Sequence, residues 1–289
     1  QLIHEITGPV IPTVIHGVKA VHAVDAAGVH PLLLAIGSER YMPFLDRPAP
    51  QELLTQANAI LGQGQLSLAK YLFIVSHNDA PTLDIHDIDA FLSHLLSRID
   101  WSRDVHFQTR TTIDTLDYSG GGLNSGSKVV FAAVGPPKRE LLRETPSSLS
   151  LPEGCGAARL CLPGVLAVAG PRHASFDGLR DDFASKLAAA IGERDWPEGL
   201  PLLVIVDDAE FTAKTLNNFL WVTFTRSNPA ADIFGAKETV EEKHWGCRSP
   251  LIIDARIKAH HAPVCEVDDA TARRIDALAA KGGPLAKYL

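Results

Sequence analysis

One stretch of this sequence combines residue types that could bind an anion. It runs from Ser119 to Lys128 and holds four glycines before a lysine. Glycines let a backbone approach a ligand closely, and successive N–H groups can bind an anion. The spacing matches neither GxGxxG nor GxxxxGK[ST], which disfavours a nucleotide-phosphate site. A binding loop and a plain surface loop both stay open as interpretations of this stretch.

An acidic pair, Asp207 and Asp208, directly follows the apolar run 202–206. Parallel sheets commonly place functional groups where a buried strand ends. Acidic residues in the same place also cap the next helix and interact favourably with its dipole. We favour this structural role for the pair.

Other catalytic and metal-binding patterns are absent from the sequence. None of the twelve histidines has HExxH spacing, and no GxSxG motif is present. The four cysteines form no CxxC pair, which favours free thiols over a disulfide framework or a zinc knuckle. We therefore assign no catalytic residue and no metal ligand to this chain.

The composition limits the classes of protein to which the chain can belong. It has 289 residues, of which 46% are hydrophobic, and a net charge of -7. This balance is that of a soluble, globular protein, and it disfavours nucleic acid as a partner. Four free thiols favour a cytoplasmic location. No apolar run is long enough to span a membrane. Because the only methionine is Met42 and the chain begins with Gln1, we expect a piece of a longer protein.

The elements that must position these residues alternate between apolar runs and amphipathic stretches. Strands are predicted at 20–24, 31–36, 71–75, 105–108, 129–134, 165–169, 202–206 and 251–253. Helices are predicted at 50–61, 85–99, 176–191, 210–226 and 271–280, with Asp84 as the N-cap of the second. The alternation predicts an α/β fold of two βαβ-type modules, with mostly parallel sheets flanked by helices.

The chain divides into two modules joined by a linker. We place the first α/β module at residues 1–136 and a Pro- and Ser-containing linker at 137–156. A second α/β module with a C-terminal helix occupies residues 157–289.

The two modules share one spacing that suggests internal duplication. A helix ends in Arg98 and Asp104 follows, just as Arg226 is followed by Asp232 in the second module. Arginine at a helix C-terminus can cap the last carbonyls. The aspartate can pair with that arginine or hold the loop through an Asx turn. We therefore expect structural roles for both residues.

Three motifs of the first module resemble the C-terminal region of the UbiD family of decarboxylases. They are RIDWSRD at 98–104, DTLD at 114–117 and NSGSK at 124–128, within a resemblance that spans residues 68–131. The stretch 129–141 departs from the family, which usually has Met-Gly-Ile-Asp-Ala-Thr there. The second module keeps Ile253-Asp254-Ala255, and its presence is not typical of shorter family members.

The resemblance implies an enzyme that uses prenylated FMN, a divalent metal and a monovalent cation. Such enzymes reversibly decarboxylate aromatic or α,β-unsaturated acids, and their flavin-binding domain lies upstream of this region. The resemblance thus implies a homo-oligomer that pairs with an upstream flavin-binding domain, and a chain that alone binds no cofactor and is inactive. It also implies a loop facing the substrate pocket, with candidate residues Asp114, Asp117, Gly122, Leu123, Asn124, Ser125, Ser127 and Lys128.

Two other interpretations stay open. The chain could be a non-catalytic assembly module that pairs with itself or with a flavin-binding partner. It could also be a small-molecule-binding α/β domain of unrelated chemistry.

Overall fold

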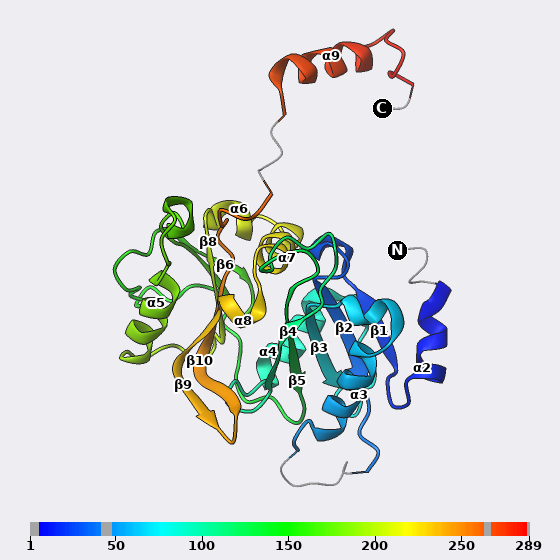
Figure 1. The fold of residues 1–289 in the computed structure, drawn as a ribbon, viewed down its shortest axis with the longest axis vertical. Helices are drawn as coiled ribbons and strands as arrows, with labels where there is room; N and C mark the ends of the chain where they lie inside the picture. The colour runs from blue at the N-terminus through cyan, green and yellow to red at the C-terminus, as the bar shows by residue number, and fades with distance from the viewer. Residues whose placement is uncertain (1–5, 42–47, 263–266, 288–289) are drawn as a thin grey trace.

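The computed structural model describes residues 6–41, 48–262 and 267–287, and it contains two five-stranded mixed sheets (Figure 1). Gln1, Met42 and Cys265 lie outside these ranges. The sheets have orders β1-β2-β3-β5-β4 and β6-β7-β8-β10-β9. In each sheet the three inner strands are parallel and the two edge strands are antiparallel to their neighbours. The predicted α/β fold, with parallel inner strands in two sheets flanked by helices, is confirmed.

The strands are β1 (Ala20–Ala23), β2 (Leu32–Gly37), β3 (Tyr71–Ser76), β4 (Val105–Thr111), β5 (Gly126–Ala133), β6 (Ala158–Leu162), β7 (Val165–Ala169), β8 (Leu202–Val206), β9 (Ile233–Glu241) and β10 (His244–Asp254). The α-helices are α2 (Ile11–Val14), α3 (Gln51–Leu61), α4 (Ile88–Arg98), α5 (Phe183–Gly192), α6 (Ala209–Ala213), α7 (Leu216–Thr225), α8 (Pro229–Asp232) and α9 (Asp269–Ala279). The described residues also form short 3₁₀ helices: η1 (Gly8–Val10), η2 (Asp25–Ala27), η3 (Gly64–Leu68) and η4 (Ala174–Asp177). Within the described ranges, every helix is too short or too polar to cross a lipid bilayer.

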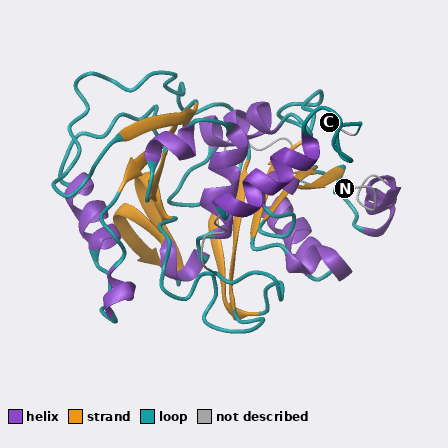
Figure 2. Cartoon of the chain, turned by 90° about the horizontal axis from the view of Figure 1, so that it is seen from above, coloured by secondary structure: helices purple, strands orange, loops and turns teal. Residues whose placement is uncertain are grey.

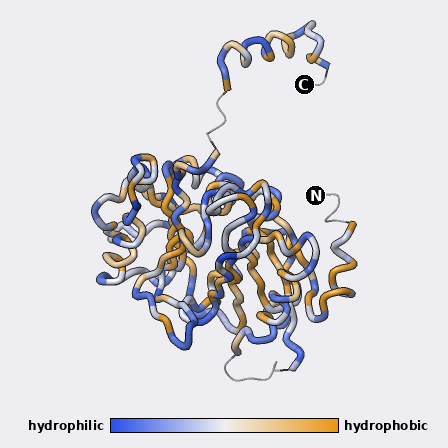
Figure 3. The backbone as a smooth tube through the Cα atoms, viewed as in Figure 1, coloured by the Kyte–Doolittle hydropathy of each residue, from blue (hydrophilic) through white to orange (hydrophobic). Residues whose placement is uncertain are grey.

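Each sheet is apolar on both faces, because its inner strands are buried throughout. Alternate residues of a strand point to opposite faces, so Leu32 and Leu34 enter one core while Leu33 and Ala35 enter another. Helix α3 covers the outer face of the first sheet, and α5 covers the outer face of the second. The hydropathy colouring of Figure 3 shows the inner strands as largely hydrophobic.

The inner faces of the two sheets and helices α4 and α7 form one continuous core. It includes Phe91 of α4, Phe224 of α7, Phe131 of the first sheet and Val204 of the second. Figures 1 and 2 show the two sheets on opposite sides of these helices. Residues 134–157 contain no helix or strand, in keeping with the predicted linker. The exact boundaries at 137 and 156 stay a prediction.

The modules hold each other through equivalent loops that follow α4 and α7. The indole Nε1 of Trp101, after α4, donates to the carbonyl of Pro201 before β8 (2.9 Å). In the reverse direction, the N–H of Ala230 in α8, just after α7, donates to Ser127 Oγ in β5 (2.8 Å). This reciprocity and the common strand order support the inference of a duplicated module.

The repeated aspartates stabilise these loops, but through a backbone N–H four residues earlier and not through the predicted Asx turn. Asp104 accepts from the N–H of Asp100 (2.8 Å), and Asp232 accepts from the N–H of Asn228 (2.7 Å). Neither aspartate pairs with the arginine that ends the preceding helix. Asp104 pairs with Arg103, and Asp232 pairs with Lys258.

Several predicted helices have different ends in the structure. Helix α4 begins three residues later than expected, with Asp87 rather than Asp84 accepting the capping N–H. The predicted helix 176–191 is interrupted because Gly178 takes a left-handed conformation. The predicted helix 210–226 is two helices, and Thr215 caps the second of them.

Candidate functional site

A cavity of about 860 Å³ lies between the two modules. The first module contributes two segments, Gly28–Pro31 before β2 and Asp114–Tyr118 before β5. The second contributes residues of α6 and α7 and of the chain after β10. These are Phe211, Trp221, Thr225, Arg226, Ile257, His261 and Ala262. The cavity thus lies where the amino ends of the parallel strands of the first sheet face the carboxyl ends of the parallel strands of the second sheet.

His30 and Asp114 form a pair on the wall of the cavity. The imidazole Nδ1 contacts Asp114 Oδ2, and the backbone N–H of Leu116 donates to Asp114 Oδ1 (2.7 Å). Partial burial alone would raise the pKa of Asp114, but the Leu116 N–H and His30 together hold it below its usual value. Asp114 is therefore an ionised acceptor that orients the His30 ring.

A buried cluster of Lys70, Asp117 and Ser119 lies beside this pair. Lys70 Nζ contacts Asp117 Oδ2 and Ser119 Oγ, both at 2.7 Å. Ser119 Oγ also donates to Asp117 Oδ1 (2.5 Å). Burial lowers the pKa of Lys70, while the carboxylate of Asp117 counteracts this effect. The cluster fixes the loop before β5 against the start of β3.

The second module surrounds the cavity with paired charges of its own. Arg226, at the end of α7, pairs with Asp207 (3.2 Å), which also accepts the N–H of Ile257 (2.9 Å). Asp208 caps α6 by accepting the N–H of Phe211 (3.0 Å). The structural roles favoured for this acidic pair therefore agree with its contacts.

Burial also shifts the acid–base properties of groups near the cavity. Burial raises the pKa of Asp232 to about 6, although Lys258 acts in the opposite direction. Burial and the nearby positive charge of Lys258 lower the pKa of His261 to about 3. His261 is therefore neutral at physiological pH, and its Nδ1 accepts from the Lys258 N–H (3.2 Å).

The eight predicted site residues fall into two groups. Asp114 and Asp117 line the cavity, together with Leu116 and Tyr118 between them. The other six do not line it, and they are Gly122, Leu123, Asn124, Ser125, Ser127 and Lys128.

The glycine-bearing stretch forms a hairpin-like turn that leads into β5. Gly122 and Ser125 form a bridge, and Asn124 donates to the carbonyl of Ile113 (3.0 Å). Lys128 Nζ contacts the carbonyls of Ser67 and Ala69, and burial lowers its pKa to about 8. Its amino group is thus committed to backbone carbonyls and does not extend into the turn to bind an anion.

Three cavity residues carry chemistry that the sequence did not indicate. His30 lies 84 positions from its partner Asp114, so no local spacing could reveal the pair. Phe211 and Trp221 are half exposed and belong to the other module. Only a topology that joins the two modules could bring these residues together.

One group of metal-binding side chains occurs among the described residues, formed by His173, Asp181 and Asp254. Both carboxylates already bind the buried guanidinium of Arg256, each at 2.6 Å from its Nη2. A divalent cation at this place would have to displace or repel that fixed positive charge. The group therefore does not fit the metal of a flavin site, and we derive no chemistry from it.

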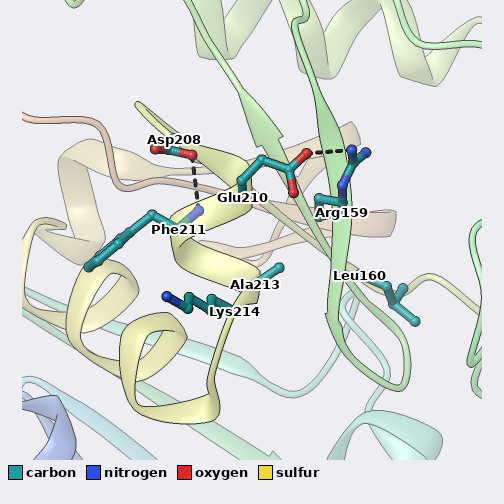
Figure 4. Close-up of a pocket in the computed structure, with 7 residues that line it drawn as sticks. All are labelled: Arg159, Leu160, Asp208, Glu210, Phe211, Ala213 and Lys214. Atoms are coloured by element: carbon teal, nitrogen blue, oxygen red, sulfur yellow. Dashed lines mark hydrogen bonds and ion pairs between the residues drawn. The ribbon is translucent and has the colours of Figure 1, made fainter.

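A second hollow of about 550 Å³ lies beside α6 and β6 (Figure 4). An ion pair between Arg159 and Glu210 crosses it, and the side chain of Lys214 lies nearby. The two paired side chains are more than half exposed. The hollow offers no buried polar group comparable to those of the inter-module cavity.

Comparison with known proteins identifies the first module. Residues 1–133 match the family model of the 3-octaprenyl-4-hydroxybenzoate carboxy-lyase C-terminal domain, UbiD_C. The chain is 32% identical over 272 residues to an uncharacterized protein of Chlamydia trachomatis, covering 93% of this chain and 42% of that relative. It is 30% identical over 273 residues to a 4-hydroxybenzoate decarboxylase subunit of Chlamydia pneumoniae, covering 94% of this chain and 42% of that relative.

Among solved structures, the UbiD-class enzyme HmfF of Pelotomaculum thermopropionicum in complex with FMN matches with a TM-score of 0.36 and 17% identity. That match covers 49% of this chain and 28% of HmfF. The present chain spans less than half the length of the curated relatives it matches. The family model thus identifies residues 1–133, the first module, as a UbiD C-terminal domain.

Proposed function

We propose that this chain is the C-terminal, oligomerising and pocket-forming part of a UbiD-like decarboxylase. The complete enzyme uses prenylated FMN and a divalent metal on an aromatic or α,β-unsaturated acid. Family membership and the name of the Chlamydia pneumoniae relative support the decarboxylase class. In this proposal the upstream domain supplies the flavin chemistry, as the resemblance to the UbiD family implies.

The observation that carries the proposal is the exposed apolar surface of the loop before β5. Leu116, Tyr118 and Leu123 are 79%, 61% and 80% exposed. Clustered large apolar side chains on a surface mark a place where another surface or a ligand packs. We assign this surface to contact with the flavin-binding domain, which would bring Asp114 and Asp117 to the edge of the substrate pocket.

The test is reconstitution with a flavin-binding domain, which the proposal places upstream of this chain. We expect decarboxylation of 4-hydroxybenzoate, monitored by the release of carbon dioxide, only when this domain, prenylated FMN, the divalent metal and the present chain are combined. The double variant Leu116→Ser/Tyr118→Ser should lower the rate at least about tenfold by weakening the contact. Light scattering should show a homo-oligomer of the assembled protein.

A matched control is Phe176→Ser, which alters an exposed aromatic residue outside this surface. It should leave the rate unchanged. Full activity in the loop double variant, or no decarboxylation of any aromatic or α,β-unsaturated acid by the assembled protein, would contradict the proposal.

A further inference from the structure

We propose that the cavity between the two modules binds a non-helical segment of a second polypeptide that carries two adjacent leucines. The reason lies in the duplicated architecture, because the place in the molecule that corresponds to this cavity is filled by such a segment, the linker residues 138–142. The binding site does not depend on the decarboxylase proposal, since every residue that supports it belongs to the present chain.

Equivalent segments precede β2 in the first sheet and β7 in the second. Each of these strands pairs in parallel with the next inner strand from its first residue onward, so Pro31 before β2 corresponds to Gly164 before β7. The cavity lies between Pro31 and Arg226 at the end of α7, the central helix of the other module. Its counterpart is therefore the place between Gly164 and the end of α4.

The linker enters this counterpart across the end of α4. Arg139 Nη1 donates to the carbonyls of Leu96 and Ile99, both at 2.8 Å. The N–H of Lys138 donates to the carbonyl of Ser97 (2.8 Å). The last carbonyls of a helix have no donor within the helix, so the linker satisfies groups that would otherwise need water or another cap. These bonds fix the linker against the helix end.

The same segment then packs two leucines against the second module. The N–H of Leu142 donates to the carbonyl of Gly199, and its carbonyl accepts the N–H of Gly164, both at 2.9 Å. Leu141 packs against the core between the sheets, and Leu142 packs against the outer core of the second sheet. A Cβ atom on Gly164 would come within 2.8 Å of Leu141 Cδ2. The leucines therefore fill the counterpart of the cavity closely.

The cavity itself has no such filling among the described residues. The chain after β10 corresponds to the linker after β5, but its described part contributes Ile257, His261 and Ala262 to the wall and leaves about 860 Å³ open. Phe211 and Trp221 on the same wall are 49% and 51% exposed. Apolar side chains that line an open cavity mark a place where another apolar group packs.

A protein segment is the occupant that the filled counterpart favours. The cavity continues the interface between the modules, and Leu116 and Tyr118 extend its wall onto the exposed loop before β5. A segment of a protein that packs on this loop can therefore enter the cavity. Pro31 has no N–H, so the bond that Gly164 gives to the linker has no equivalent here. The two leucine side chains of the ligand must supply most of the affinity, through the burial of apolar surface.

The test uses the peptide PPKRELLRE, which has the sequence of residues 136–144, with a fluorophore at its amino end. Its fluorescence anisotropy is measured as the full chain is added, without flavin. We expect saturable binding below millimolar concentration. A control peptide with both leucines replaced by serine should bind at least about tenfold more weakly, because the burial of a single leucine is worth a factor of that order.

Two variants connect the binding to the cavity. Trp221→Ala removes a large aromatic side chain from the wall and should weaken binding of the leucine peptide about tenfold. Phe176→Ala, at an exposed aromatic position outside the cavity, should leave the binding unchanged. Circular dichroism checks that each variant is folded.

Three results would overturn the inference. They are equal binding of the leucine and serine peptides, no binding of the leucine peptide at millimolar concentration, and unchanged binding to a folded Trp221→Ala protein. Because no decarboxylation is measured, failure here leaves the proposed enzyme function intact. Conversely, an assembled protein without decarboxylase activity would not affect this result.

Discussion

At the scale of single residues, Lys70 and Asp117 form a buried ion pair in which each charge requires the other. Their side chains are 1% and 4% exposed. Removing one member of such a pair leaves the other charge buried without compensation, which costs more than the intact pair contributes. Ser119 adds hydrogen bonds to both partners, so the cluster depends on all three groups.

We expect Lys70→Met to lower the free energy of unfolding by about 3–5 kcal/mol, as measured by urea denaturation. The double variant Lys70→Met/Asp117→Leu should recover part of this loss, because it buries no unpaired charge but leaves Ser119 without its two side-chain partners. Lys186→Met is the matched control, since Lys186 pairs with Asp182 in an exposed helical pair. It should cost less than about 0.5 kcal/mol. Equal losses in Lys70→Met and the double variant would show that the ion pair is not the cause.

The sequence indicated part of this site and missed the rest for a physical reason. Asp114 and Asp117 were found through a motif, because both lie on one short loop. Lys70 and His30 reach that loop from the starts of other strands. Phe211 and Trp221 reach the cavity from the other module, and their half exposure gives no periodic signal.

At the scale of elements, all six inner strands match predicted strands, whereas only β1 and β4 of the four edge strands do. Strands β3 and β8 are buried on both faces, so they appear as continuous apolar runs. The edge strands β6 and β9 contain many half-exposed and exposed residues and were not predicted. Helix ends depend on which side chain accepts the first free N–H, and closely spaced aspartates make that choice ambiguous.

Helix α4 offers a direct test of such a choice. Asp87 accepts the N–H of Ala90 (3.0 Å), whereas Asp84 accepts the N–H of His86 in the preceding turn (2.9 Å). We expect Asp87→Ala to lower the free energy of unfolding by about 1 kcal/mol and Asp87→Ser to restore most of it. Asp84→Ala should cost less in the same urea titration. The reverse order would mean that the helix begins near residue 85, as the sequence suggested.

At the scale of the whole molecule, two histidines meet where the modules join. The rings of His106 in β4 and His244 in β10 lie 4.9 Å apart between centroids. Both Nε2 atoms are buried, and neither has a hydrogen-bond partner among the described residues. Burial and the neighbouring His244 lower the pKa of His106 to about 4, compared with an ordinary value of 6.5. Protonation of His106 is therefore unfavourable in the folded state.

The lowered pKa of His106 predicts that the folded chain is less stable at acidic pH. Between pH 6.5 and about 4 the unfolded chain binds a proton at His106 and the folded chain does not, so the free energy of unfolding falls as the pH is lowered. His106→Phe, which keeps a ring but cannot titrate, should show a smaller fall in urea titrations across this range. His16→Phe, at an exposed position, should behave like the parent chain. An identical pH dependence in His106→Phe would rule out this contribution.

The continuous core between the two sheets has a consequence for any protein with only one such module. A solitary module would leave the inner face of its sheet and its central helix, with residues such as Phe91 and Phe131, uncovered by a second sheet. Two separate copies could cover these faces only by meeting in solution, which becomes rarer on dilution. A peptide connection keeps the two halves at a high effective concentration. Fusion thus turns a dimerisation equilibrium into a step of folding and frees the rest of the surface for other contacts.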